Sequence, residues 1–189
     1  MEPFYPFQIP IWGIIFNAHK LQSVDYRSYI TKMTNTTPTV IKNNIGGWQS
    51  NNLLHDIPIF KELFSEISYI CDAVASEYLK IQVSGYIDSA WANVNYKHSL
   101  NLAHIREGDL SGTFHLKAPD NSGNLIFINP AVRSQSQKIS INNFVVVPEE
   151  LAIIIFPSWL EHYVEPNKSD EQRITISFNY KIKEQYAQN

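Results

Sequence analysis

The stretch FPSWLEHYV, residues 156–164, is followed by RITISFN, residues 173–179. The first stretch ends an apolar run, and a Pro-Ser-Trp turn then leads to His162. The second stretch alternates as a strand does, so Arg173 and Thr175 share one face. The pattern predicts two successive strands, with a histidine at the rim of one and an arginine opening the next.

The composition is typical of one folded domain. The chain has 189 residues, of which 44% are apolar and 13% aromatic, and this is enough for a sizeable core. Lys and Arg number 15 and Asp and Glu 18, which gives a net charge of -3, and there is no basic cluster of the kind that neutralises phosphates. We therefore do not expect nucleic acid as a partner.

The cysteine content and the N-terminal sequence indicate the cellular compartment of the protein. The lone Cys71 cannot form an internal disulfide, and its apolar helical surroundings favour a small buried hydrophobe. The N-terminus is acidic and broken by prolines, unlike a signal peptide. No apolar run approaches the ~18 residues of a membrane span. We expect a cytoplasmic protein without a membrane segment.

The first third of the sequence predicts an edge strand, a helix and a loop. Residues 7–16 are expected to be extended, and the prolines at positions 6 and 10 suit an edge strand. A helix is expected from the cap Ser23 through Met33. Residues 34–56 are rich in Asn, Thr and Gly and are expected to form a long loop.

A second helix is predicted from Pro58, which suits a first helical turn. Apolar residues recur there at three- and four-residue steps and predict one buried face: Ile59, Leu63, Ile67, Ile70, Val74 and Tyr78.

Short strands fill the rest of the chain. The apolar pattern changes to a period of two or to short runs at 83–96, 110–116, 125–128, 143–147, 151–156 and 173–180. Early helices followed by many short strands indicate a mainly β protein with N-terminal helices (α+β), folded as a jelly roll. We expect a single domain over 1–189, in which residues 1–82 pack on a β core of residues 83–183.

His162, Arg173 and Thr175 suit a ferrous site that binds a keto-diacid. Such a site usually has two histidines and one carboxylate on one octahedral face. His162 taken alone would more often be a packed or surface histidine. Arg173 in an apolar strand needs an anionic partner, and its planar fork can bind the far carboxylate of 2-oxoglutarate, with Thr175 as a further donor. The alternative is a structural acid beside Arg173, either Glu161 or Asp170.

The second histidine ligand should lie on an earlier strand. The best candidate is His104, in the stretch NLAHIREGDLSG at 101–112. Lys117 could compete with Arg173 as the carboxylate anchor, although a lysine at a strand end is commonplace on a surface.

Several of these motifs occur together in one order. They are GWQS at 47–50, WANVN at 91–95, Asn101 with His104, LSG at 110–112, GNL at 123–125 with Asn129-Pro130, and the two stretches at 156–162 and 173–179. From about residue 46 to 180 the chain resembles the small 2-oxoglutarate/Fe(II) oxygenases common in marine phages and bacteria. The resemblance implies a double-stranded β-helix, or jelly roll, that binds Fe(II) and 2-oxoglutarate and hydroxylates a substrate. By the same resemblance, His104 and His162 would bind iron, and Arg173 with Thr175 would hold the cosubstrate.

The chain also departs from this family, most clearly at position 106. Members of the family carry a side chain able to bind metal two residues after the first histidine, and this chain has Arg106, which has no lone pair to offer. Asp109 is the first candidate for the third ligand, with Glu107 as an alternative. His115, on the polar face of its strand, could complete a three-histidine site or contact the cosubstrate. An exogenous ligand could also fill the place, or iron binding could be lost.

The substrate is less well marked. Trp91, Asn93 and Asn95 alternate along one strand and could line a substrate cavity, although a strand with outward polar residues explains them equally well. We expect a small-molecule or peptide substrate. The rival functions are a metal-free binding module on the same scaffold and a structural or carbohydrate-binding jelly roll.

Overall fold

The computed structural model describes residues 8–17, 24–130 and 143–183. Within these ranges the chain forms two β-sheets whose strands pair antiparallel, as the jelly-roll prediction requires. Neither helix in these ranges combines the length and the apolar character that a membrane span needs.

The larger sheet has six strands. Their order is β1 (Trp12–Ile15), β9 (Ala152–Pro157), β6 (Leu110–Lys117), β11 (Arg173–Ile182), β4 (Gly85–Asn95) and β3 (Trp48–Gln49). The edge position of β1 confirms the prediction made from the prolines at positions 6 and 10.

The smaller sheet has five strands. Their order is β2 (Asn44–Ile45), β5 (Leu100–His104), β10 (His162–Val164), β7 (Leu125–Phe127) and β8 (Phe144–Val146). No strand range was predicted for β5 or β10, although His104 was expected to lie on a strand. Strands β2 and β3 lie inside the segment predicted as a loop, which also holds a short 3₁₀ turn, η2 (Leu54–Asp56).

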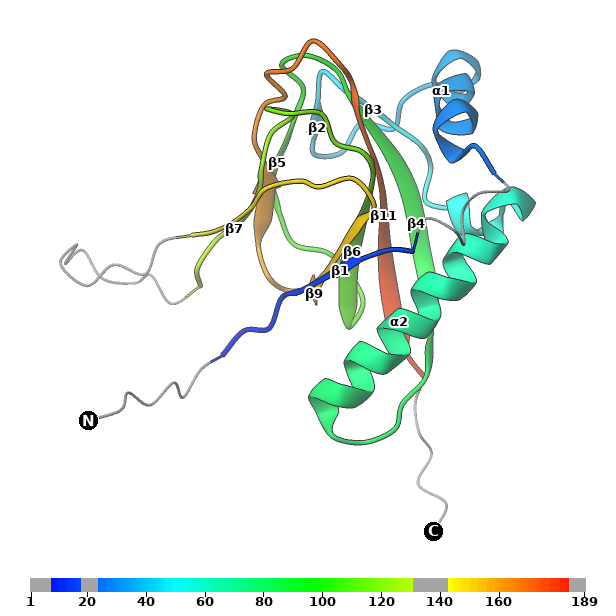
Figure 1. Cartoon of the computed structure of the whole chain (residues 1–189), viewed down its shortest axis with the longest axis vertical. Coiled ribbons are helices and arrows are strands. Elements are labelled where there is room, and N and C mark those ends of the chain that lie inside the picture. The colour runs from blue at the N-terminus through cyan, green and yellow to red at the C-terminus, as the bar shows by residue number, and fades with distance from the viewer. Residues whose placement is uncertain (1–7, 18–23, 131–142, 184–189) are drawn as a thin grey trace, which may run out of the picture.

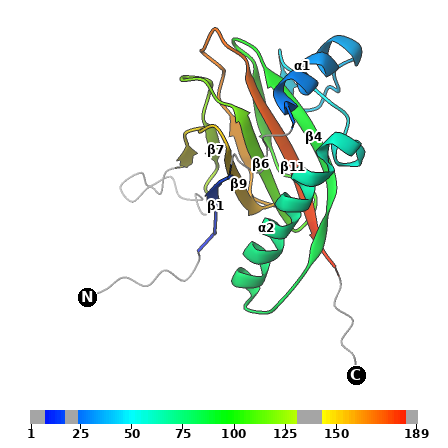
Figure 2. The ribbon, with the colours of Figure 1, turned by 45° about the vertical axis from the view of Figure 1, so that its right-hand side comes forward.

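The helices lie on the outer face of the larger sheet. Helix α1 (Tyr26–Thr36) is capped by Asp25, whose carboxylate accepts a hydrogen bond from the Ser28 amide at 3.0 Å. The predicted cap Ser23 lies outside the described residues. Helix α2 (Lys61–Leu79) follows the 3₁₀ turn η3 (Pro58–Phe60) and runs along the sheet on the side away from the smaller sheet (Figures 1 and 2).

The buried face of α2 differs in part from the predicted one. Its buried residues are Leu63, Phe64, Ile67, Cys71, Val74 and Ala75. Tyr78 was expected in this face but is 55% exposed, with its ring edge-on against Trp12. Tyr78 falls in the last turn of the helix, where it meets the edge strand β1 through Trp12.

The two faces of β11 separate the core from the pocket. Ile174, Ile176, Phe178 and Tyr180 are buried in the core that the larger sheet shares with the helices. The alternate residues Arg173, Thr175, Ser177 and Asn179 line a pocket on the opposite face of the same strand. A second, smaller apolar cluster joins the two sheets, and it contains Leu125 and Phe127 of one sheet with Ile154 and Phe156 of the other. The space between the sheets is therefore part apolar core and part polar pocket.

Candidate metal and cosubstrate site

His104 and His162 face each other on the smaller sheet. His104 ends β5 and His162 begins β10, and the two are direct partners in the antiparallel pairing. Their ring centroids are 4.4 Å apart. The sequence placed both residues in the site, and the pairing of two short strands is what brings them together.

The hydrogen bonds of both rings leave one nitrogen free for a ligand. Each Nδ1 lies 2.8 Å from the carbonyl oxygen two residues earlier, Leu102 for His104 and Leu160 for His162. Only an N–H can donate to a carbonyl, so each neutral ring keeps its Nε2 lone pair. Nε2 of His162 is buried and has no partner among the described residues. Two such lone pairs side by side suit a bound metal cation.

Burial keeps these two imidazoles neutral. It lowers the pKa of His104 to about 4 and that of His162 to about 2, and the nearby Arg106 cation lowers each further. The ring of His162 is fully buried against Phe127 and Phe156. Both histidines are therefore in the protonation state that metal binding needs.

Arg173 lies at the start of β11 and is only 3% exposed. Its Nη1 donates to the Gly123 carbonyl at 2.9 Å, and its Nε has no partner among the described residues. The structural-acid alternative is wrong for Asp170, which pairs with Lys97 at 2.6 Å, and Glu161 makes no ion pair with Arg173 either. A buried guanidinium with a free N–H is suited to an incoming carboxylate.

Thr175 and His115 surround Arg173. They are direct partners between β11 and β6, both are buried, and both line the same pocket as Arg173. Burial, with the Arg173 cation second, lowers the pKa of His115 to about 3. Lys117, the rival anchor, instead pairs with Glu171 at 2.7 Å.

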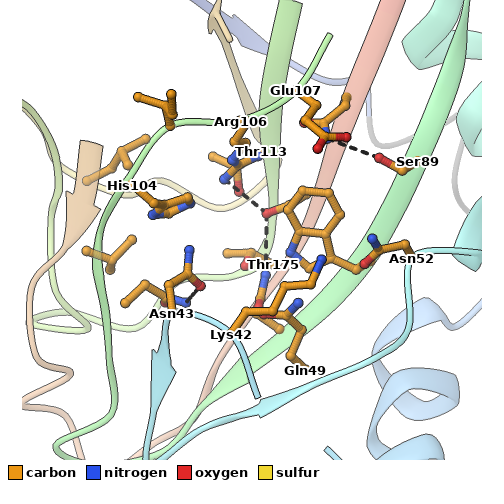
Figure 3. A pocket seen from close by; sticks show the side chains of 18 of the residues that line it. Lys42, Asn43, Gln49, Asn52, Ser89, His104, Arg106, Glu107, Thr113 and Thr175 are labelled. Carbon is orange, nitrogen blue, oxygen red and sulfur yellow. Dashed lines mark hydrogen bonds between the residues drawn. The ribbon is translucent and has the colours of Figure 1, made fainter. Parts of the chain in front are cut away.

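Arg106 occupies the side of the pocket next to the two histidines. Its Nη1 donates to the Gly112 carbonyl at 3.0 Å, and its guanidinium lies 5.0 Å from the ring centre of Trp91 and 5.5 Å from that of Phe156. Burial lowers its pKa to about 9, so it remains a cation at neutral pH. Figure 3 shows Arg106 pointing into the pocket beside His104.

The candidates for the third metal ligand do not join the histidines. Asp109 is exposed, and its carboxylate accepts a hydrogen bond from the Ile182 amide at 2.8 Å, at the far end of β11. Glu107 lines the pocket but is exposed, and His115 lies beside Arg173. Within the described ranges no group of three His, Cys, Asp or Glu residues converges on one point. The preference for Asp109 is therefore not supported.

The pocket has a volume of about 480 Å³, in the range of small-molecule sites. Trp91 and Asn93, the candidates for contact with a substrate, line it. Asn95 does not, because its side-chain amide donates to Asn101 at 3.2 Å instead.

Other lining residues were missed by the sequence analysis. They include Lys42, Gln49, Thr113, Ser177 and Asn179. The period-two pattern that placed Arg173 and Thr175 also marks Ser177 and Asn179, and the same reasoning applies to Thr113 beside His115. Lys42 and Gln49 lie in the segment predicted as a loop, where no period marks a facing side.

Residues 89–179, which hold both histidines and Arg173, match the family model described as "Putative 2OG-Fe(II) oxygenase". The match covers just under half of the chain, and this part of the chain is similar to that family. No curated protein sequence matches the chain.

Solved structures with the same fold include several oxygenases. A prolyl-4-hydroxylase from Pseudomonas putida is 10% identical, with 92% of each chain covered and a TM-score of 0.65. An oxidoreductase of the 2OG-Fe(II) oxygenase family from Burkholderia pseudomallei is 13% identical, with 90% of this chain and 85% of that chain covered and a TM-score of 0.65. HygX from Streptomyces hygroscopicus, solved with nickel, 2-oxoglutarate and hygromycin B, is 10% identical, with 92% of this chain and 83% of that chain covered and a TM-score of 0.63. At these identities the likeness establishes the jelly-roll fold.

The site fits the cofactors of this oxygenase family in two respects and departs in one. The unpaired N–H of Arg173 fits a carboxylate, and the free Nε2 atoms of the histidine pair fit a metal cation. The described residues offer no carboxylate beside those histidines, and Arg106 lies there instead.

Proposed function

We propose that the chain is a 2-oxoglutarate-dependent Fe(II) oxygenase that hydroxylates a small molecule or peptide. In this proposal His104 and His162 hold the iron, and Arg173 with Thr175 holds the far carboxylate of 2-oxoglutarate. The observation that carries the proposal is the histidine pair, with ring centroids 4.4 Å apart and both Nδ1 atoms engaged by backbone carbonyls. When bound, the iron and 2-oxoglutarate together supply dioxygen activation.

The protein's part in this chemistry is to fix the ligands. The hydrogen bonds to Leu102 and Leu160 set the tautomer and the orientation of the two rings. The apolar rings around His162 shield its nitrogen from bulk water. Both imidazoles therefore stay neutral and oriented before a metal binds.

Arg173 serves the cosubstrate rather than the fold. The described residues give it no ion pair, and the cost of burying its charge is offset only when an anion binds. A carboxylate between Arg173 and Thr175 would supply that anion and satisfy the free Nε–H.

In this proposal the metal has two protein ligands. Cosubstrate and exogenous ligands would fill the remaining positions, because no carboxylate from the described residues is close enough. Arg106 is the feature that favours the alternative, a metal-free binding module, since a guanidinium beside the histidines repels a metal cation.

Anaerobic addition of Fe(II) and 2-oxoglutarate tests the proposal. A chelated keto acid gives a weak visible absorption band, which we expect in the parent protein and not in His162→Ala. The matched control is His55→Ala, which removes a histidine outside this pocket and should retain the band. Absence of the band in the parent, with 2-oxoglutarate still bound by calorimetry, would favour the metal-free module.

A further inference from the structure

Arg106 is a half-buried cation held in place by uncharged groups. Its Nη1 donates to the Gly112 carbonyl at 3.0 Å, and its guanidinium lies over the ring of Trp91. Its Nε is buried and has no hydrogen-bond partner within the described part of the chain. The contacts fix the guanidinium in the pocket without neutralising it.

The pocket as a whole is short of negative charge. Its charged lining residues in the described ranges are the cations Lys42, Arg106 and Arg173 and the exposed acid Glu107. No carboxylate there is within ion-pair distance of Arg106 or Arg173. Burial lowers the pKa of both arginines, and no acid opposes it.

Loading the site with its proposed cofactors does not remove this imbalance. A site of the usual kind has two histidines and one carboxylate at the iron, and one arginine at the cosubstrate. The negative charges of that carboxylate and of the 2-oxoglutarate dianion then equal the positive charges of the arginine and the iron dication. Here Arg106 replaces the carboxylate, so the loaded pocket keeps two unbalanced positive charges. Charge of that size in a partly desolvated pocket attracts an anion.

We propose that the substrate carries an acidic group, a carboxylate or a phosphate, that pairs with Arg106 beside the two histidines. The proposal rests on the proposed function, because the substrate is taken to enter the pocket that holds the cofactors. Lys42 lies across the pocket from Arg106 in the view of Figure 3 and is exposed. Its ammonium can attract the acidic group of the substrate as the substrate enters.

The uncharged residues that line the pocket add a second requirement for the substrate. Oε1 of Gln49 and Oδ1 of Asn93 are buried acceptors without a hydrogen-bond partner among the described residues, and both residues line the pocket. Unsatisfied buried acceptors favour a ligand that donates N–H or O–H groups. The substrate class is therefore a small polar acid with donor groups, such as a hydroxy acid or an amino acid.

Fluorine NMR with two probes of equal shape tests the charge requirement. Trifluoroacetate carries the acidic group, and trifluoroacetamide replaces it by a neutral amide. Binding of each is measured by line broadening on the full chain loaded with Zn(II) and 2-oxoglutarate. We expect at least about tenfold tighter binding of the acid, falling to about threefold or less in Arg106→Gln. The matched control Lys97→Gln, at an exposed ion pair with Asp170, should keep the preference.

The outcomes separate this inference from the proposed function. Equal binding of the two probes by the parent overturns the inference, even if Fe(II) and 2-oxoglutarate give their absorption band. Loss of the preference in Arg173→Gln but not in Arg106→Gln also overturns it, because the acid would then occupy the cosubstrate position. Displacement of the acid by chloride at equal concentration overturns the assignment to an organic acid. A preference that Arg106→Gln removes supports the inference, even where the absorption band is absent and the proposed function fails.

Discussion

Arg106 limits the number of bonds that the chain can make to a metal. Arg106→Asp should raise the affinity for Mn(II) at least about tenfold, because it removes a repelling cation and adds a carboxylate beside His104 and His162. Calorimetric titration of Mn(II) in the presence of 2-oxoglutarate measures the change. Arg106→Gln is the control, since it removes the cation without adding a ligand, and its gain should be smaller. Equal gains in the two variants would show that a side chain at this position does not reach the metal.

Arg173 is the residue on which cosubstrate binding depends in the proposal. Arg173→Gln should weaken 2-oxoglutarate binding about 10- to 100-fold, which corresponds to the loss of about 1.5–3 kcal/mol for a hydrogen bond to a charged group. The free energy of unfolding should not fall by a comparable amount, because the buried cation has no ion pair to lose. Calorimetry and urea denaturation measure the two quantities.

Lys117→Gln is the matched control for that experiment. Lys117 was the rival anchor, but its ammonium pairs with Glu171, which is exposed. Its removal should change 2-oxoglutarate binding less than twofold. A larger effect in Lys117→Gln than in Arg173→Gln would reverse the two assignments.

At the scale of elements, the contact between β6 and β11 depends on Gly112. A Cβ at this position would lie 2.2 Å from the ring of Phe178, which is fully buried. Gly112→Ala should therefore lower the free energy of unfolding by about 2–3 kcal/mol through overpacking. It should also disturb Arg106, which donates to the Gly112 carbonyl.

Gly13→Ala in β1 is the control for this packing effect. Its new Cβ would meet the Ile154 side chain at 3.7 Å, an ordinary van der Waals distance. Urea denaturation should place Gly13→Ala within about 0.5 kcal/mol of the parent. Similar losses in both variants would mean that backbone flexibility, and not the Phe178 contact, sets the cost.

Strands with an apolar pattern of their own could be predicted from sequence, whereas β5 and β10 could not. The six predicted runs correspond to β4, β6, β7, β8, β9 and β11, because each carries its own apolar pattern. Strands β5 and β10 have five and three residues and take their pairing from each other through His104 and His162. The formation of such strands depends on the neighbouring strands more than on their own residues.

Dependence on neighbouring structure also explains why the prediction of Asp109 as the third metal ligand is not supported. After Arg106 the backbone turns at Gly108, whose φ is +98°, a conformation that favours glycine. This turn sends Asp109 to the end of β11, where it bonds the Ile182 amide. Counting residues from His104 could not reveal that change of direction, whereas the strand period was enough to place Arg173 and Thr175 on one face.

At the scale of the whole molecule, two buried histidines and the half-buried His104 make the fold sensitive to acid. Burial holds the pKa of His104, His115 and His162 at about 4, 3 and 2, below the ordinary value of 6.5. Between pH 6.5 and about 4 the unfolded chain binds protons that the native chain does not bind. The free energy of unfolding must therefore rise with pH across this window and fall as the solution is acidified.

The size of this effect can be measured without any cofactor. Each fully buried histidine contributes up to about 1.4 kcal/mol per pH unit, and His104 contributes less because it is partly exposed to the pocket. We expect a combined slope of about 2–4 kcal/mol per pH unit from these groups, measured by urea denaturation between pH 6 and 4.5. His115→Gln removes one titrating group and should reduce the slope by about 1 kcal/mol per pH unit. Parallel curves of unfolding free energy against pH for parent and variant would mean that His115 takes up a proton in the native state. A second cation would then lie beside Arg173, which would contradict the neutral state of His115 in the pocket.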